Sequence, residues 1–222
     1  MNNLKLKIAG RLLILSLIPI LYFSCSDKKK TTLPVLGMHD YIEREEGGQK
    51  IIDTVWHTIP EFSFWDQDSN KVTKTTFHDN IYIADFFFTT CPTICPTVKG
   101  QMLRVYNKYA DNDKIKLLSH SIDTRHDSVP VLKDYASKLK IGSDRWQLVT
   151  GERDHIYNMA RSYFIAAEED SNAPGGYTHS GGLVLVDPDF RVRGIYDGTD
   201  EEAVDELMQD IDLLLKLTDN NE

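Results

Sequence analysis

The sequence predicts an α/β protein in which helices cover a central mixed β-sheet. A continuous apolar run at residues 81–88 suits a strand that is buried on both faces. After this run, helical and strand patterns alternate up to residue 163. Two hairpin patterns flank the alternating part, at residues 59–76 and 183–196.

The first predicted hairpin precedes the buried strand. Residues 59–64 are rich in apolar side chains, residues 66–70 form a turn cluster, and residues 72–76 alternate. The run at 81–88 then combines β-branched and aromatic side chains, which favour strands. Pro96 begins a helical pattern whose apolar stripe continues to Tyr109.

The remaining elements follow in regular order. They are a strand at 115–122, a helix at 129–139, a strand at 146–149, a helix at 155–163, a long loop at 166–180, hairpin strands at 183–186 and 192–196, and a helix at 201–217. Because helical crossovers join parallel strands, this order indicates a parallel core with an antiparallel pair at its edge. The plan is thioredoxin-like, with added β-hairpins.

The first 24 residues have the layout of a secretory signal peptide. Three basic residues precede an apolar run of 13 residues at 12–24, which is shorter than the roughly 20 residues of a membrane span. The leader resembles a bacterial lipoprotein signal in which Cys25 becomes the lipidated first residue, although Tyr22 replaces the usual small aliphatic residue. The alternative is an uncleaved signal anchor at residues 12–23. Both interpretations place the globular part outside the cytoplasm, anchored to a bacterial membrane on the periplasmic side.

Charge and cysteine content restrict the function further. The 222 residues include 25 Lys and Arg against 34 Asp and Glu, so the net charge is −9; loss of residues 1–24, with three basic residues and no acid, makes it −12. Such an acidic protein is not expected to bind nucleic acid. We predict a polar tether with little fixed structure at residues 25–55 and one domain at 56–218. With Cys25 lipidated, Cys91 and Cys95 are too few for a multi-bridge scaffold.

Cys91 and Cys95 lie where the buried strand passes into a helix. Residues four apart share a helix face, and a helix N-terminus lowers thiol pKa, so we predict two adjacent thiolates. A packing or disulfide role is less consistent, because a bridge across so short a loop adds little stability. The spacing is one residue longer than the Cys-x-x-Cys of thiol oxidoreductases and leaves room for a soft metal. Two sulfurs do not complete a structural zinc site, so a third ligand is needed.

His179 stands out among the seven histidines of the chain. It lies in a glycine-flanked run at residues 175–182 that leads into a strand. Glycine permits unusual backbone angles and close approach to another loop. In the predicted fold, the start of this strand lies beside the helix that carries the cysteines.

Three motifs together resemble the Sco/SenC family. They are Asp85-Phe-Phe-Phe-Thr-Thr-Cys91-Pro-Thr-Ile-Cys95-Pro96, Ser121-Ile-Asp123 through Asp127, and Tyr177-Thr-His179-Ser with Val186-Asp-Pro-Asp189. The resemblance covers roughly residues 59–217. It implies a membrane-tethered, extracytoplasmic thioredoxin fold that binds copper and helps to build the binuclear copper centre of cytochrome c oxidase.

The resemblance also implies the roles of single residues. Cys91 and Cys95 correspond to thiolate ligands and His179 to an imidazole ligand, a set that suits Cu(I), and Cu(II) if a further ligand joins. Asp123 matches a family acid that orients His179 or contacts a partner; the alternative is a solvated loop carboxylate. The role of Asp127 stays open. In the middle motif of this chain no proline follows Asp123, and the basic residue, Arg125, is shifted. Thr178 precedes His179 where many family members have an acid. These departures concern the surroundings of the ligands and not the ligands themselves.

Two main functions follow from these observations. The first is a copper chaperone, not an enzyme, that passes copper to the copper-binding subunit of cytochrome c oxidase. The second is a thiol–disulfide oxidoreductase in which Cys91 and Cys95 are a redox-active pair for the cysteines of exported proteins. A peroxide-reducing enzyme is disfavoured because its lone attacking cysteine with a nearby Arg and Thr is not evident. Replacing His179 separates the two main functions, because only the chaperone needs its imidazole.

Overall fold

A computed structural model describes residues 30–219, so the predicted signal peptide and Cys25 lie outside the described residues. The body contains a seven-stranded sheet with strand order β11-β10-β5-β6-β7-β3-β4. Its centre is parallel and consists of β5 (Ile81–Phe87), β6 (Ile115–Ser121) and β7 (Trp146–Thr150). The antiparallel strands are β10 (Gly182–Val186) and β11 (Val192–Asp197) at one edge and β3 (Ser63–Asp66) and β4 (Lys71–Thr73) at the other. The predicted mixed sheet with a parallel core is confirmed.

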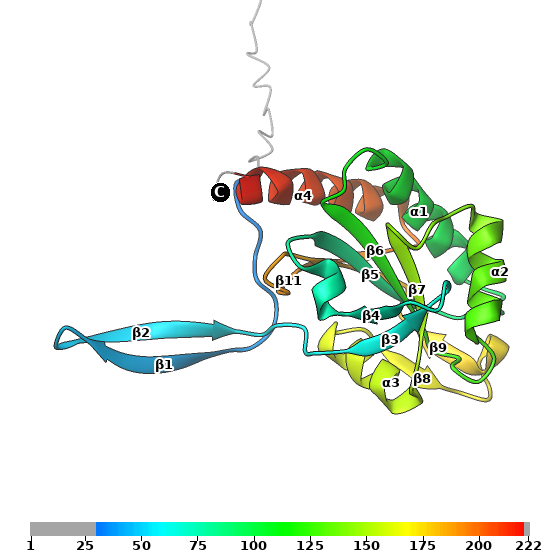
Figure 1. Cartoon of the computed structure of the whole chain (residues 1–222), viewed down its shortest axis with the longest axis horizontal. Helices are drawn as coiled ribbons and strands as arrows, with labels where there is room; N and C mark the ends of the chain where they lie inside the picture. Colours follow the sequence, from blue (N-terminus) through cyan, green and yellow to red (C-terminus); the bar gives the residue numbers. More distant parts are fainter. Residues whose placement is uncertain (1–29, 220–222) are drawn as a thin grey trace, which may run out of the picture.

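Helices pack against both faces of the sheet. They are α1 (Cys95–Lys108), α2 (Val129–Leu139), α3 (Arg153–Ser162) and α4 (Glu201–Asp219), with short 3-10 turns η1 (Lys74–Phe77) and η2 (Pro174–Gly176). Figure 1 shows α1 and α4 together on one side of the sheet and α3 on the opposite side. The apolar stripe of α1 buries Val98, Met102 and Val105, as the sequence pattern predicts.

The central strand β5 organises the site end of the sheet. All seven of its residues are buried, which agrees with the continuous apolar run. Parallel pairing sets Phe87 of β5 opposite Ser121 of β6, so both strands end at the same edge of the sheet. The segment that carries Cys91 leaves the sheet at this edge, which is where ligands commonly bind in α/β folds.

Residues 39–56 correct the prediction of a tether with little fixed structure. β1 (His39–Glu46) and β2 (Gln49–Trp56) form an antiparallel hairpin that projects from the body (Figure 1). The prediction was wrong because it overlooked Gly47 and Gly48, whose φ angles of 63° and 81° make the two-residue turn that joins hairpin strands. That the segment spaces the domain from a membrane stays a prediction.

The chain before the hairpin is attached to the body. Lys30 Nζ lies 2.9 Å from the Asp210 carboxylate of α4. Leu33 is only 6% exposed, and the Leu36 amide donates to the Val192 carbonyl of β11. The first part of the predicted tether, residues 30–36, is therefore held against α4 and β11, and the hairpin that follows it is not.

Residues 166–180 also contain more structure than the predicted loop. β8 (Ala167–Glu169) and β9 (Tyr177–His179) pair antiparallel and form a small separate sheet. Strands of three residues are too short to show an alternating pattern in the sequence. Within residues 30–219, no helix combines the length and the apolar character that a membrane span requires.

Candidate metal centre

The two cysteines begin the first crossover helix. Cys95 is the first residue of α1, and Cys91 lies in the loop between β5 and α1. The Cys91 amide donates to the Phe88 carbonyl at 3.2 Å, which folds this loop back over the end of the strand. Cys91 is 9% exposed and Cys95 2% exposed, and both are free thiols.

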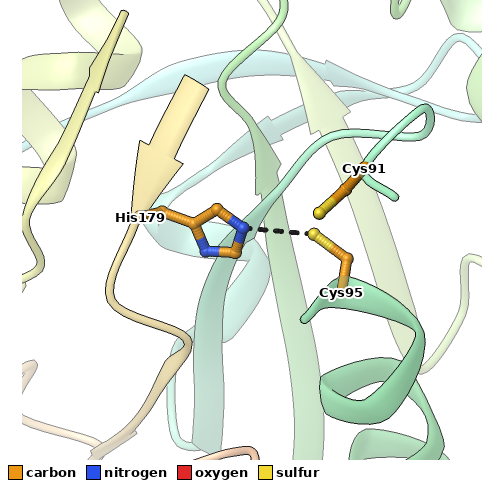
Figure 2. Close-up of side chains that lie close together, drawn as sticks. All are labelled: Cys91, Cys95 and His179. Carbon is orange, nitrogen blue, oxygen red and sulfur yellow. Dashed lines mark hydrogen bonds between the residues drawn. The ribbon is translucent and has the colours of Figure 1, made fainter. Parts of the chain in front are cut away.

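His179 approaches the cysteines from the small β8–β9 sheet. Its Nε2 atom lies 3.1 Å from Cys95 Sγ, as the dashed line in Figure 2 marks. One donor atom from each of Cys91, Cys95 and His179 lies within 4.8 Å of the other two. The structure thus brings together the three residues that the sequence analysis predicts as copper ligands, and their role as ligands stays a prediction.

Glycines allow the two segments to approach this closely. Gly175 has a φ of 83°, and a Cβ atom there would lie 2.7 Å from the Phe88 ring and 3.3 Å from Pro92. Gly181, with a φ of 67°, packs against Ile94 in the same way, its Cβ position being 3.1 Å away. The predicted close approach between the glycine-flanked run and the cysteine loop is confirmed.

The two thiols differ in acidity. Burial raises the pKa of Cys91, but hydrogen bonds from Cys95 and from Thr93 outweigh burial and bring the pKa below its ordinary value. Burial and the hydrogen bond with Cys91 raise the pKa of Cys95 well above its ordinary value. The prediction of two adjacent thiolates is therefore wrong for the metal-free site, because a buried pair of thiols retains one proton on Cys95.

The imidazole of His179 is held in its neutral form. Burial lowers the pKa of His179, opposed by Asp85 and assisted by Lys99. Its Nδ1 atom is buried and has no hydrogen-bond partner among residues 30–219. A neutral imidazole, a thiolate and a releasable thiol are soft donors that together fit Cu(I).

Asp123 contacts the strand that carries His179, not the imidazole itself. Its Oδ1 atom accepts a hydrogen bond of 2.8 Å from the Tyr177 hydroxyl, and Tyr177 lies in β9 two residues before His179. Arg125 Nη2 lies 3.3 Å from the same hydroxyl. With 9% exposure, Asp123 is a buried acid and not the solvated carboxylate of the alternative interpretation.

Asp127 fastens the loop before Cys91. It is fully buried and accepts hydrogen bonds from the Thr89 amide at 3.0 Å and from the Thr89 hydroxyl. The Ser121 hydroxyl donates to it at 2.6 Å, and the His126 ring lies 2.9 Å away. The second acid of the middle motif therefore links the cysteine loop to the end of β6.

A buried ion pair below the cysteines was not predicted. Lys99 Nζ lies 2.7 Å from the Asp85 carboxylate, and both residues are 1% exposed. A weak signal existed, because Lys99 falls on the apolar stripe of α1 and Asp85 interrupts the apolar run of β5. Neither pattern alone reveals that the two charges meet.

Known proteins are similar to this chain in sequence. The family model described as SCO1/SenC matches residues 53–216. A SCO1 protein homolog from Bacillus subtilis strain 168 is 29% identical over 167 residues, which cover 74% of this chain and 86% of the relative. A putative copper-binding protein from Stutzerimonas stutzeri is 28% identical, over 73% of this chain and 80% of the relative.

The solved structures agree with the sequence relatives. BsSco, described as a member of the Sco family of cytochrome c oxidase assembly proteins with a disulfide switch, has a TM-score of 0.61 and 26% identity, and the match covers 71% of this chain and 93% of that chain. The likeness confirms the predicted thioredoxin-like fold with its mixed sheet and flanking helices. On the match over residues 53–216, this chain belongs to the SCO1/SenC family.

Proposed function

We propose that this protein is a membrane-anchored, extracytoplasmic copper chaperone that delivers copper to the binuclear copper centre of cytochrome c oxidase. One observation carries the proposal: two sulfurs and an imidazole nitrogen, from segments 84 residues apart in the sequence, lie within 4.8 Å of one another. Such a soft donor set selects Cu(I). A relative at 28% identity is described as a putative copper-binding protein, which supports the same ligand.

Copper binding and thiol chemistry are coupled at this site. Cu(I) binding requires both sulfurs as thiolates, so Cys95 releases its proton when the metal binds. Exchange with a disulfide of another protein would pass two electrons to that disulfide, which becomes a dithiol, and would leave Cys91 and Cys95 joined without thiolate donors, so that copper is released. The redox state of the cysteines thereby controls whether the protein holds or delivers its cargo. Cu(II) binding needs a further ligand.

The anchor and the acceptor complete the proposal. Lipidation of Cys25 would hold the protein at the membrane, and the copper-binding subunit of cytochrome c oxidase is the proposed acceptor. BsSco is described as belonging to a family of oxidase assembly proteins, which supports this acceptor. The excess of acidic residues in the chain suits docking to a basic surface.

A second candidate function is thiol–disulfide exchange with exported proteins. The difference in acidity between the cysteines favours it, because the more acidic and more exposed Cys91 is suited to attack a disulfide while Cys95 supplies the second thiol. Both cysteines also line a cavity of about 310 Å³. In this function His179 has no required role.

A Cu(I) titration separates the two candidates. Reduced protein comprising residues 26–222 is titrated in competition with a Cu(I) chelator, alongside His179→Ala and a control variant, His78→Ala, whose side chain is 71% exposed. The chaperone function predicts one tight equivalent in the parent and the control, and much weaker binding in His179→Ala. Equal binding by all three proteins excludes His179 as a ligand, and no binding by the parent leaves thiol exchange as the function.

A further inference from the structure

Lys99 is a buried cation with no assigned role in the proposed function. Its side chain is 2% exposed, and its Nζ atom lies 2.7 Å from both the Asp85 carboxylate and the Ser119 hydroxyl. Ser119 also donates to Asp85 and accepts from the Trp146 indole at 2.8 Å. The ammonium group lies 3.9 Å from the centroid of the Phe87 ring, which adds a cation–π contact.

A contribution to the stability of the fold does not by itself explain the buried ion pair of Lys99 and Asp85. Transfer of two charges from water to the core costs about as much as their mutual attraction returns, and packed apolar side chains of similar volume usually serve as well. α1 buries apolar residues at the other positions of its inward face, including Val98 and Met102. A charge at position 99 therefore suggests a role in the chemistry of the neighbouring site.

The cation of the pair lies on the same helix as Cys95 and in the same cavity wall as both cysteines. Lys99 follows Cys95 by four residues on α1, so the two side chains leave the same face of the helix. Lys99 lines the same cavity as Cys91 and Cys95, and Asp85 does not line it. Consistent with this arrangement, Lys99 opposes the rise in the pKa of Cys95, whereas Asp85 acts more strongly on the pKa of His179 than Lys99 does.

The charge of the site depends on what it holds. Cu(I) with two thiolates and a neutral imidazole has a net charge of −1, whereas Cu(II) with the same donors is neutral, and so is the disulfide. A buried cation on the sulfur side lowers the free energy of the anionic form and not that of the neutral forms, and interior charge interactions are screened far less than surface ones.

We propose that Lys99 is the counter-ion of the Cu(I)-loaded dithiolate and makes the site prefer Cu(I) over Cu(II). Asp85 and Ser119 hold the ammonium group in position and keep it charged in the core. This inference rests on the proposed copper-binding function and adds to it a residue that determines which oxidation state is carried.

The test compares Cu(I) and Cu(II) affinities of the full-length protein in detergent micelles. The double variant Lys99→Met with Asp85→Asn removes both charges at nearly constant volume, so that no unpaired charge is left in the core. We expect Cu(I) binding to weaken about threefold to tenfold while Cu(II) binding changes less than twofold. Because a general loss of folded protein weakens both affinities, the readout is the ratio of the two affinities, and circular dichroism checks that the variant is folded.

Lys138→Met is the matched control. Lys138 lines the same cavity, but its side chain is 72% exposed, so solvent screens its charge and neither affinity is expected to change. An equal loss of both affinities in the double variant, or no loss of either, overturns the role of Lys99. Failure of the unmodified protein to bind Cu(I) would instead refute the proposed function.

A redox titration gives a second readout that a structural role would not move. In a dithiothreitol buffer, the Cys91–Cys95 disulfide takes two electrons from the reagent and one of the two protons that the reagent loses, which leaves Cys91 as the thiolate and Cys95 as the thiol, and the other proton goes to the buffer. Loss of the cation should disfavour the reduced, thiolate-containing state threefold to tenfold, which lowers the potential by about 14 to 30 mV. An unchanged or raised potential contradicts the proposal.

Discussion

The two segments that supply the sulfur and nitrogen donors are held in different ways. The cysteine segment joins β5, which is wholly buried, to the 14-residue helix α1, and Asp127 fastens its first turn. The His179 segment belongs to two strands of three residues each, and β8 is largely exposed. Its side chains are attached to the body through Tyr177 to Asp123 and through Glu169 to Arg125 and Arg153.

The unequal attachment of the two segments suits a site that both holds and releases a metal. The sulfur pair is fixed by the core, whereas the imidazole approaches from a segment with few attachments, and lightly attached segments open most readily. We expect that changes in the cysteine segment abolish binding or destabilise the fold. Changes in the His179 segment should instead alter affinity with little loss of stability.

The largest effect on copper is expected from Cys95→Ser. The hydroxyl is a hard donor and a poor ligand for Cu(I), so affinity should fall by more than the 10- to 100-fold typical of changes outside the ligand set. Chelator competition measures it. The serine should leave the urea midpoint nearly unchanged, and a loss of affinity below tenfold would show that Cys95 is not a ligand.

The largest effect on stability is expected from Asp127→Ala. The substitution leaves the Thr89 amide and the Ser121 hydroxyl without the partner they have in the core. We expect the free energy of unfolding in urea to fall by about 3 kcal/mol. A change smaller than about 1 kcal/mol would mean that the cysteine segment is held by its backbone alone.

Acid should lower the free energy of unfolding through His120, which lies in the core beside β5. This residue of β6 is fully buried, and burial lowers its pKa from 6.5 to about 4. Below pH 6.5 the unfolded chain takes up a proton that the folded chain does not, so stability falls until about pH 4, by about 3 kcal/mol in total. His120→Leu should flatten this part of the urea stability profile, and an unchanged slope would assign the acid sensitivity to other groups.

The smallest effect is expected from Tyr177→Phe in the His179 segment. It removes the hydrogen bond to Asp123 and the longer one from the exposed Arg125. Asp123 keeps the His126 amide as a donor, so stability should change by about 1 kcal/mol. Cu(I) affinity should fall a few-fold because His179 is less well positioned. Faster amide hydrogen exchange in β9 with unchanged exchange in β5 would confirm that only this segment loosens; uniform change in both would remove the distinction between them.

The same contrast explains what the sequence could and could not predict. β5, α1 and α2 were predicted to within a residue or two because long buried elements impose a clear period on the sequence. β8 and β9 are too short for a period, and the β1–β2 hairpin was missed because its Gly47-Gly48 turn was not used as a signal. Local pattern thus decides which elements can be found.

The site, like the fold, could be predicted only where a local sequence pattern encodes it. Cys91, Cys95 and His179 follow from motifs, but the difference in acidity between the thiols depends on burial and on hydrogen bonds that appear only in the folded chain. The meeting of Lys99 with Asp85 depends on how α1 packs over β5, which no local pattern encodes.

X-ray absorption at the copper edge of the Cu(I)-loaded protein tests the three-donor site most directly. The proposed site predicts two sulfur ligands and one nitrogen ligand around each copper, with the nitrogen lost in His179→Ala. A spectrum with sulfur ligands alone in the unmodified protein would contradict it, because the imidazole that lies 3.1 Å from Cys95 Sγ would then have no part in binding the metal.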